Sequence, residues 1–157
     1  MFEDNVAVPM DPSRTHRGLS GSILRMKDGS LLFIHGIETN PEKCEGWIEA
    51  RTSQDDGRTW GEPFSPLPRV ENFEAISPSL MRLDNGDILF FYILDVLSAR
   101  PQGWSDFTTT LNQHMYVRRS SDEGVTWSDP ICATHFPGLC ESQADKAMRL
   151  SSGRIVI

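Results

Sequence analysis

The sequence predicts an all-β protein, a β-propeller assembled from four-stranded antiparallel blades. Three observations lead to this fold class: an eight-residue pattern that occurs twice, a β-hairpin pattern that occurs three times, and the absence of helical periodicity over any stretch of eleven or more residues. The hairpin patterns are centred on Gly29, Gly86 and Gly153, which lie 57 and 67 positions apart (86 − 29 = 57; 153 − 86 = 67). Periods of this length with about four strands each are typical of propeller blades.

The eight-residue pattern S-x-D-x-G-x-T-W occupies residues 53–60 and returns at residues 120–127. Each copy follows a predicted strand and precedes a proline by three positions, so we expect each copy to form a turn. The Ser and Asp side chains should bond to nearby backbone N–H groups, the Gly should adopt a positive φ, and the Trp should fold back over the turn. The turn residues are Ser53, Asp55, Gly57, Thr59 and Trp60 in the first copy, and Ser120, Asp122, Gly124, Thr126 and Trp127 in the second.

In chain order, residues 1–20 are predicted to be a polar, looped approach. The first blade covers about residues 20–68, with strands near 22–26, 30–36 and 47–52 and a short piece after Trp60; three prolines in 63–68 exclude a helix there. The second blade covers about residues 69–136, with strands near 79–83, 87–94 and 115–119 and a piece around Ile131, and residues 95–106 have room for a short helical turn. Residues 137–157 begin a third blade.

The up-and-down order of strands divides the loops between two faces of the predicted fold. The tight glycine turns and the two repeat turns belong to one face, and their residues are structural. The longer loops, predicted at residues 37–46, 69–77, 95–113 and 136–145 and in the approach to Ser22, belong to the other face. Because binding and catalysis concentrate in long loops that strand connection does not require, we expect the functional site on that second face.

Composition indicates a globular domain and limits its partners. Hydrophobic residues make up 38% and charged residues 24% of the sequence, and the net charge is −7. This charge argues against nucleic acid and anionic membrane surfaces as partners, although local arginines can still hold a small anion. The first residues have neither a basic region nor an apolar run typical of a secretory signal, so the chain as given is expected to be cytoplasmic.

Cysteine and histidine patterns give no indication of a cofactor or a metal. Cys44, Cys132 and Cys140 are odd in number and lack metal-ligand spacing, which favours reduced thiols in packing or loop positions. The four histidines also lack such spacing, and we interpret each as a strand-end or loop residue.

The repeat turns resemble the Asp-box, or BNR repeat, of the sialidase (neuraminidase) superfamily. The resemblance extends from Arg17 to Ile157 and implies a six-bladed propeller, of which this sequence holds about two and a half blades. It also implies an exo-glycoside hydrolase in which arginines bind the substrate carboxylate, an Asp is the acid/base, and a Tyr paired with a Glu is the nucleophile. On this reading the chain is an N-terminal portion or a truncated product, and the remaining blades follow Ile157.

The resemblance places candidate site residues on the second face. Glu45 best matches the acid/base, with Glu in place of Asp. Arg17 lies two positions from the place of the first arginine, where this sequence reads Leu-Ser-Gly instead of Arg-Ile-Pro. The substrate-binding candidates are Arg17, Glu74, Trp104, Asp106, Gln143, Asp145 and Lys146. Several of these residues have a structural alternative. Glu45, like Glu38 and Glu42, could be a solvated loop charge, and Trp104 could anchor its loop. Asp145 and Lys146 could form a structural salt bridge.

Two functions follow from this pattern. The first is a sialidase-like hydrolase acting on sialic acid or a related sugar, for which acidic groups in the long loops supply proton transfer. The second is a noncatalytic propeller that binds glycans or proteins, because the repeat turn itself is scaffolding. The acidic loops favour the hydrolase, with a carbohydrate as its substrate.

Overall fold

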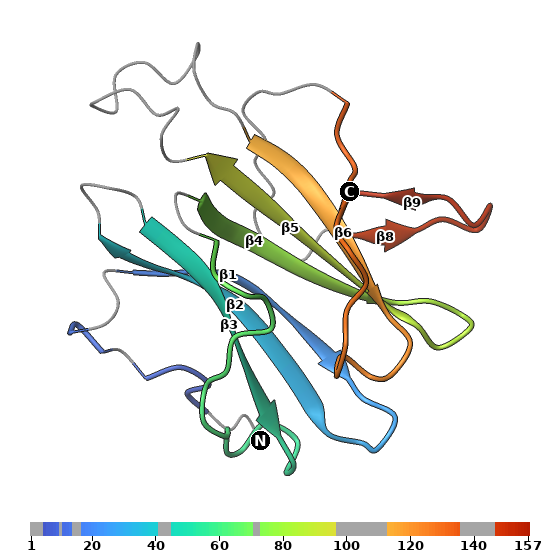
Figure 1. The fold of residues 1–157 in the computed structure, drawn as a ribbon. Helices are drawn as coiled ribbons and strands as arrows, with labels where there is room; N and C mark the ends of the chain where they lie inside the picture. The colour runs from blue at the N-terminus through green and yellow to red at the C-terminus, as the bar shows by residue number, and fades with distance from the viewer. Residues whose placement is uncertain are drawn as a thin grey trace.

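The computed structural model describes residues 5–9, 11–13, 17–40, 45–70, 73–96, 113–135 and 147–157, of which residues 17, 18, 39, 40, 45 and 96 are described by their backbone alone. The described chain is all-β and forms three antiparallel sheets (Figure 1). The first sheet holds β1 (Arg17–Arg25), β2 (Leu31–Asn40) and β3 (Glu45–Ser53). The second holds β4 (Phe73–Arg82), β5 (Ile88–Val96), β6 (Gln113–Ser120) and β7 (Ile131–Cys132). The third is the hairpin of β8 (Met148–Arg149) and β9 (Ile155–Val156).

The predicted repeat unit is present in the first two sheets. A hairpin closed by a tight Gly turn is followed by a third strand, a repeat turn and a short outer piece. In the second sheet this piece is β7; in the first it is a single bridge between Ala50 and Phe64, whose backbone groups exchange two hydrogen bonds of 2.8 and 2.9 Å. Figure 1 shows the β1–β2 and β4–β5 turns at the same end of the two sheets, the lower right of that view. We call this the turn end, and the other the opposite end.

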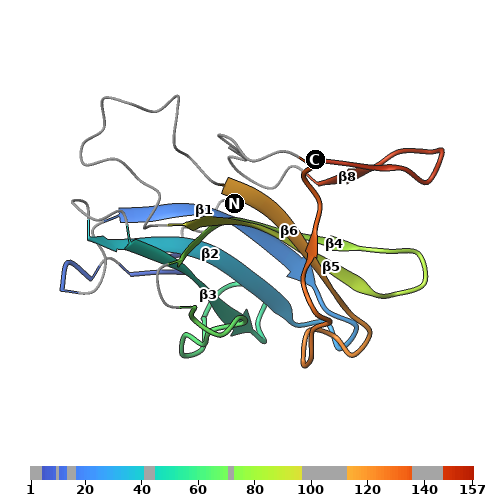
Figure 2. The ribbon, with the colours of Figure 1, turned by 45° about the horizontal axis from the view of Figure 1, so that its top comes forward.

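The first and second sheets pack face to face. Their shared core holds Leu32, Ile34, Ile48, Ala50 and Leu67 from the first unit and Leu80, Ile88, Phe90 and Tyr92 from the second. The other face of the second sheet buries Met81, Phe91, Ile93 and Met115, against which Ala147 packs just before β8. Because β5 is covered on both faces, it reads as a continuous apolar run rather than an alternating one. In Figure 2 the hairpin of the third sheet lies beside the second sheet, with its turn on the same side as the β4–β5 turn.

A buried serine joins each first strand to the next unit. The Oγ of Ser22 in β1 accepts the N–H of Leu80 in β4 at 3.0 Å, and the Oγ of Ser79 in β4 accepts the N–H of Ala147 at 3.4 Å. Ser22 and Ser79 are 57 positions apart (79 − 22 = 57), and Leu80 and Ala147 are 67 apart (147 − 80 = 67). The same contact therefore links successive units at the same place.

The strands extend further toward the opposite end than the sequence predicted. β1 begins at Arg17, so residues 17–20 belong to a strand and not to a looped approach. Residues 37–40, 45–46, 73–77, 95–96 and 113, all predicted as loop, likewise lie in β2 to β6. Polar residues in these segments pair across the strands and so continue the ladders, which the weak apolar pattern did not reveal. The helical turn proposed within 95–106 lies outside the described residues beyond position 96.

Candidate functional site

The first repeat turn is held by its own side chains. Ser53 Oγ accepts the N–H of Gly57 at 2.8 Å and donates to Asp55 Oδ1 at 2.8 Å. The Asp55 carboxylate accepts the N–H of Thr59 at 2.8 Å and its hydroxyl at 2.6 Å. These bonds, led by those from Thr59, lower the pKa of Asp55 to about 2. Gly57 has a φ of +86°, and Trp60 lies over it, as predicted.

The second repeat turn has the same bonds. Ser120 Oγ accepts from Gly124 N–H at 2.8 Å and donates to Asp122 at 2.8 Å. Asp122 accepts the N–H and the hydroxyl of Thr126 at 2.9 and 2.5 Å, which lowers its pKa to about 2. The φ of Gly124 is +82°, and Trp127 covers the turn and packs edge-on against Phe90 at 5.3 Å. Both carboxylates are occupied within their turns, so their role is structural.

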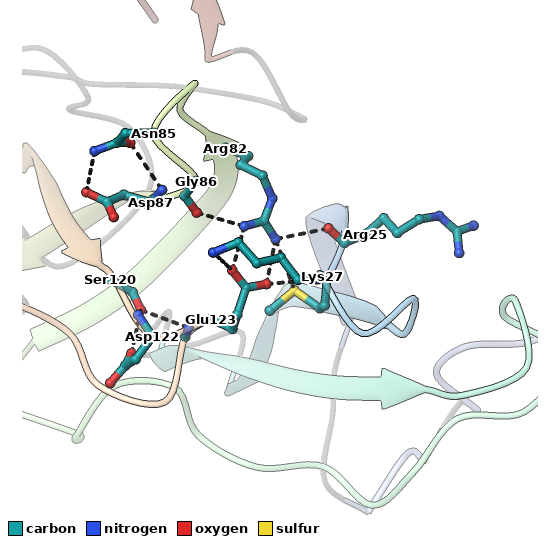
Figure 3. A network of polar contacts seen from close by, with 11 residues as sticks. Arg25, Lys27, Arg82, Asn85, Gly86, Asp87, Ser120, Asp122 and Glu123 are labelled. Atoms are coloured by element: carbon teal, nitrogen blue, oxygen red, sulfur yellow. Dashed lines mark hydrogen bonds and ion pairs between the residues drawn. The ribbon is translucent and has the colours of Figure 1, made fainter.

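Charged groups at the turn end pair between the sheets (Figure 3). The guanidinium of Arg82 binds the two carboxylate oxygens of Glu123 at 2.7 and 2.8 Å and donates to the backbone oxygens of Gly86 and Arg25. Lys27 in the first sheet donates its N–H to Glu123 at 3.0 Å, and its Nζ lies 3.1 Å from the same carboxylate. Arg82 is the main cause that lowers the pKa of Glu123 to about 2. These contacts join the first and second sheets at the turn end, so we regard them as structural.

Buried polar groups gather at the opposite end of the sheets. Both first strands have an irregularity there, between Gly18 and Gly21 in β1 and between Ile76 and Ser79 in β4. Closer to the opposite end than these irregularities, Arg17 lies opposite Glu38 in the backbone ladder of β1 and β2. Glu74 lies opposite Asp95 in the backbone ladder of β4 and β5. Glu38 and Glu74 are each 3% exposed, and Asp95 is fully buried.

The 57-residue period relates these acidic positions to one another. Glu38 and Asp95 occupy the same place in the two units (95 − 38 = 57), as do Arg17 and Glu74 (74 − 17 = 57). Strand alternation puts Glu38 on the face with Ile34, and Asp95 on the face with Ile93. Each sheet therefore presents a buried acid on the side that faces the following unit.

The two units differ in the residue opposite this acid. In the first unit it is Gly46, which pairs with Glu38; a Cβ placed on Gly46 would lie 2.6 Å from Glu74 Oε1 and 2.8 Å from the backbone oxygen of Ile37. The carboxylate of Glu74 thus lies against the backbone of β3. In the second unit, Gln113 is opposite Asp95 and donates to its Oδ2 at 3.0 Å. Gly46 leaves room for a carboxylate from the neighbouring sheet, whereas Gln113 fills that room.

The structure brings together two of the predicted site residues. Glu45 is the first residue of β3 and is adjacent to Gly46, against which Glu74 lies. Glu74 lies within β4 and is buried, so it is not on a loop between units as predicted. For Arg17 and Glu45 only the backbone is described, in β1 and β3. The remaining predicted residues lie outside the described part of the chain: Trp104, Asp106, Gln143, Asp145 and Lys146.

Sequence reasoning misjudged or missed several buried polar residues. Glu38 was interpreted as a solvated loop charge but is buried in β2, and Asp95 and Gln113 were assigned to a loop. The 57-residue period contained the signal, because it aligns Glu38 with Asp95. His35 was expected at a strand end but lies within β2, buried and stacked on Phe33 at 5.2 Å.

An aromatic side chain on β3, Trp47, borders the site. Trp47 donates its Nε1–H to Glu49 at 3.3 Å, and the guanidinium of Arg69 lies 3.4 Å from the centroid of the Trp47 ring. This stacked cation occupies one face of Trp47.

Within the ranges described above, no group of three or more His, Cys, Asp or Glu side chains is arranged to hold a metal ion. Over the same ranges, no helix has the length and apolar character needed to cross a membrane.

Comparisons with known proteins give the fold. No family model matches the sequence, and no curated protein is significantly similar to it. Among solved structures, the chain is similar to the Hadza microbial sialidase Hz136, with 17% identity and a TM-score of 0.69 over 90% of this chain and 32% of that one. It is also similar to the leech intramolecular trans-sialidase complexed with 2,7-anhydro-Neu5Ac, with 14% identity and a TM-score of 0.56 over 84% of this chain and 37% of that one. A third is the Penicillium chrysogenum α-L-arabinanase complexed with arabinobiose, with 15% identity and a TM-score of 0.56 over 92% of this chain and 35% of that one.

The chain spans about a third of the length of these structures. At these identities the likeness concerns the fold alone. Residues 1–157 therefore have the fold of part of a β-propeller of the kind found in sialidases and arabinanases.

Proposed function

We propose that residues 1–157 form the N-terminal part of a sialidase-like exo-glycoside hydrolase that cleaves a glycosidic bond to sialic acid or a related sugar. One observation carries the proposal: the buried carboxylate of Glu74 lies against Gly46, next to Glu45, at the end of the sheets opposite the structural turns. Glycoside hydrolysis requires an acid/base carboxyl group and, across the scissile bond, a carboxylate or phenolate nucleophile; in this proposal Glu45 supplies the acid/base. The propeller fold shared with sialidases supports this reading.

In this proposal Glu45 is the acid/base. It is the first residue of β3, at the opposite end of the sheets, and the substrate-binding candidate Glu74 lies against the adjacent Gly46. Arg17 binds a substrate carboxylate from the start of β1. The candidates Trp104, Asp106, Gln143, Asp145 and Lys146 complete the substrate contacts contributed by this segment.

The proposed division places the first unit at about residues 20–68, the second at about 69–136, and the start of a third at about 137–157. The nucleophile and the other arginines then belong to blades that follow Ile157. We accordingly expect residues 1–157 alone to hydrolyse no glycoside.

Assay of the protein together with the sequence encoded after Ile157 tests the proposal. The substrates are 4-methylumbelliferyl sialoside and 4-methylumbelliferyl α-L-arabinofuranoside, and the key variant is Glu45→Gln. We expect release of the fluorophore from the sialoside, and a loss of kcat in Glu45→Gln of about 100-fold or more with little change in KM.

Asp56→Asn at the turn end is the matched control, because it removes a carboxylate remote from the site, and it should retain full activity. Turnover that is unaffected by Glu45→Gln would refute the role of Glu45. Binding of glycans without turnover of either substrate would instead indicate the noncatalytic propeller.

A further inference from the structure

Each sheet has one face toward the preceding unit and one toward the following unit. We call these the back face and the front face of the sheet. The front face of the first sheet packs on the back face of the second sheet in the shared core. The front face of the second sheet is buried in turn, with Ala147 of the third unit packed against it. Successive units are therefore joined by one repeated kind of interface, front face to back face.

The back face of the first sheet has the apolar residues of this interface but is exposed. Three of its residues lie 57 positions before three core residues of the second sheet: Ile23 before Leu80, Leu31 before Ile88, and Phe33 before Phe90. Ile23 is 53% exposed, whereas Leu80 is 5% exposed. Phe33 is half-buried, whereas Phe90 is fully buried. The back face of the first sheet thus lacks the cover that the first sheet gives to the second.

The front face of the third sheet is the matching half. Its apolar residues lie 67 positions after three residues of the second sheet's front face: Met148 after Met81, Leu150 after Leu83, and Val156 after Leu89. Met148 is 58% exposed, whereas Met81 is 8% exposed. The described part of the chain therefore presents both halves of the interface between units, one at each end of the series of sheets.

These two halves do not meet within one copy of the chain. The second sheet packs on the first sheet with one face and on the start of the third unit with the other. Figures 1 and 2 both show it between the first sheet and the hairpin of β8 and β9. A contact between the two halves thus requires two copies.

We propose that a second copy of this chain covers the back face of the first sheet with the front face of its third sheet. Met148, Leu150 and Val156 of one copy then pack on the apolar back face of the other, which continues the interface that joins the first two units. The two surfaces are different, so the contact is head-to-tail, and each bound copy leaves one face free for another copy. This inference does not depend on the proposed hydrolase.

The polar contacts that accompany this packing within the chain are reduced between copies. Lys146 stands 67 positions after Ser79, so no serine is in place to accept a backbone N–H from the next copy. Ser151 stands at the place of Lys27, whose ammonium group binds Glu123 in the interface within the chain. The contact between copies therefore rests on apolar packing, and we expect it to be weak and nearly insensitive to salt.

Sedimentation equilibrium of residues 1–157 tests this proposal over about 1–200 µM, the range of weak, transient interfaces. The average mass should rise with concentration beyond that of two chains. Ile23→Asp blocks the back face and Met148→Asp blocks the front face, so each variant alone should remain a monomer. An equimolar mixture should form dimers and stop at two chains. The intact front face of the Ile23→Asp copy binds the intact back face of the Met148→Asp copy, and both remaining faces are blocked.

Val125→Asp is the matched control, because Val125 is an exposed apolar residue of the second repeat turn and belongs to neither face. This variant should associate as the unaltered protein does. Circular dichroism checks the fold of each variant, and Ile23→Ser or Met148→Ser replaces one that fails to fold.

Three results would overturn the proposal. Association of Met148→Asp alone would indicate a contact between two like back faces. A mixture of the two folded variants that stays monomeric would exclude the head-to-tail contact. A monomer at every concentration of the unaltered protein would leave a later unit of the same chain as the occupant of the back face.

Discussion

The two repeat turns have the same internal bonds, yet they differ in what they attach to. Corresponding hydrogen-bond lengths agree within 0.1 Å in the two copies. The residue after the Asp is Asp56 in one and Glu123 in the other, and both have a φ near +60°. Asp56 pairs with Arg25 of its own sheet on the surface, whereas Glu123 binds Arg82 and also reaches Lys27 of the neighbouring sheet. The two turns therefore have the same backbone, but Asp56 makes a surface ion pair within its own sheet, whereas Glu123 contacts the neighbouring unit.

The opposite end of the sheets shows a similar difference between the copies. Gly46 and Gln113 occupy the same place, 67 positions apart (113 − 46 = 67), but one admits the carboxylate of Glu74 and the other binds Asp95. The residues shared by the two copies form the scaffold. The residues that differ determine which side chains pack between one unit and the next. The candidate site lies at such a difference.

The largest expected effect comes from Gly46→Ala, which fills the space that distinguishes the first copy from the second at the opposite end. The added methyl group would lie 2.6 Å from Glu74 Oε1 and 2.8 Å from the backbone oxygen of Ile37. The Glu74 side chain can shift, but the strand backbone cannot, so we expect a loss of about 2–3 kcal/mol in the free energy of unfolding. Urea unfolding measures it.

Gly61→Ala is the control for this substitution, since its methyl group would meet Thr52 at an ordinary 3.5 Å. It should change the free energy of unfolding by less than about 0.5 kcal/mol. Equal stability of the two variants would show that Glu74 does not occupy the space beside Gly46.

Removing the buried hydroxyl from each repeat turn tests whether the two turns are equivalent. Ser53 and Ser120 are each 1% exposed, and each accepts the N–H of the turn glycine. Ser→Ala leaves that N–H without its acceptor, so each substitution should cost about 1–2 kcal/mol, and the two losses should be alike. Asp55→Ala and Asp122→Ala should also lower the unfolding midpoint while leaving ligand contacts unchanged. Thermal unfolding compares all four, and unequal losses for the two serines would mean that the surroundings contribute to the stability of the turns.

How much of this was predictable from sequence depends on how local the interactions are. The repeat turns and the Gly29, Gly86 and Gly153 hairpins depend on residues within a few positions, so their φ signs and bonds followed from the pattern. The strand ends near Glu38, Glu74 and Asp95 did not, because those polar residues are strand residues only when the neighbouring sheet buries them. The contact of Glu74 with Gly46 joins two units and has no local signal. The roles of Arg17 and Glu45 remain predictions.

Glu123→Gln tests the charged contacts that join the first two sheets at the turn end. The folded-state pKa of Glu123 is about 2, below its usual 4.5, because of Arg82 and then Lys27. A lowered pKa contributes stability that is present above the unfolded value of about 4.5 and is lost as pH falls toward 2. We expect Glu123→Gln to cost about 1–2 kcal/mol at pH 7 and almost nothing at pH 2.

The difference between the unaltered protein and Glu123→Gln isolates this residue, since Asp55 and Asp122 titrate over the same range in both proteins. A double-mutant cycle with Lys27→Met separates the contact of the Lys27 ammonium group from the pairing with Arg82, because the backbone N–H of residue 27 still donates to Glu123 in that variant. A cost that does not change with pH would exclude the charge of Glu123 as its source.

The smallest effect is expected from Asp56→Asn, the counterpart of Glu123→Gln in the first turn. Asp56 and Arg25 lie 2.9 Å apart, but their side chains are 67% and 59% exposed, so water and salt screen their attraction. The substitution should cost less than about 0.5 kcal/mol at pH 7, and that cost should disappear in 1 M salt. The same urea titration that serves for Glu123→Gln measures it. If Asp56→Asn costs as much as Glu123→Gln, the position in the turn would determine the stability, and the reach of Glu123 to the neighbouring sheet would contribute nothing.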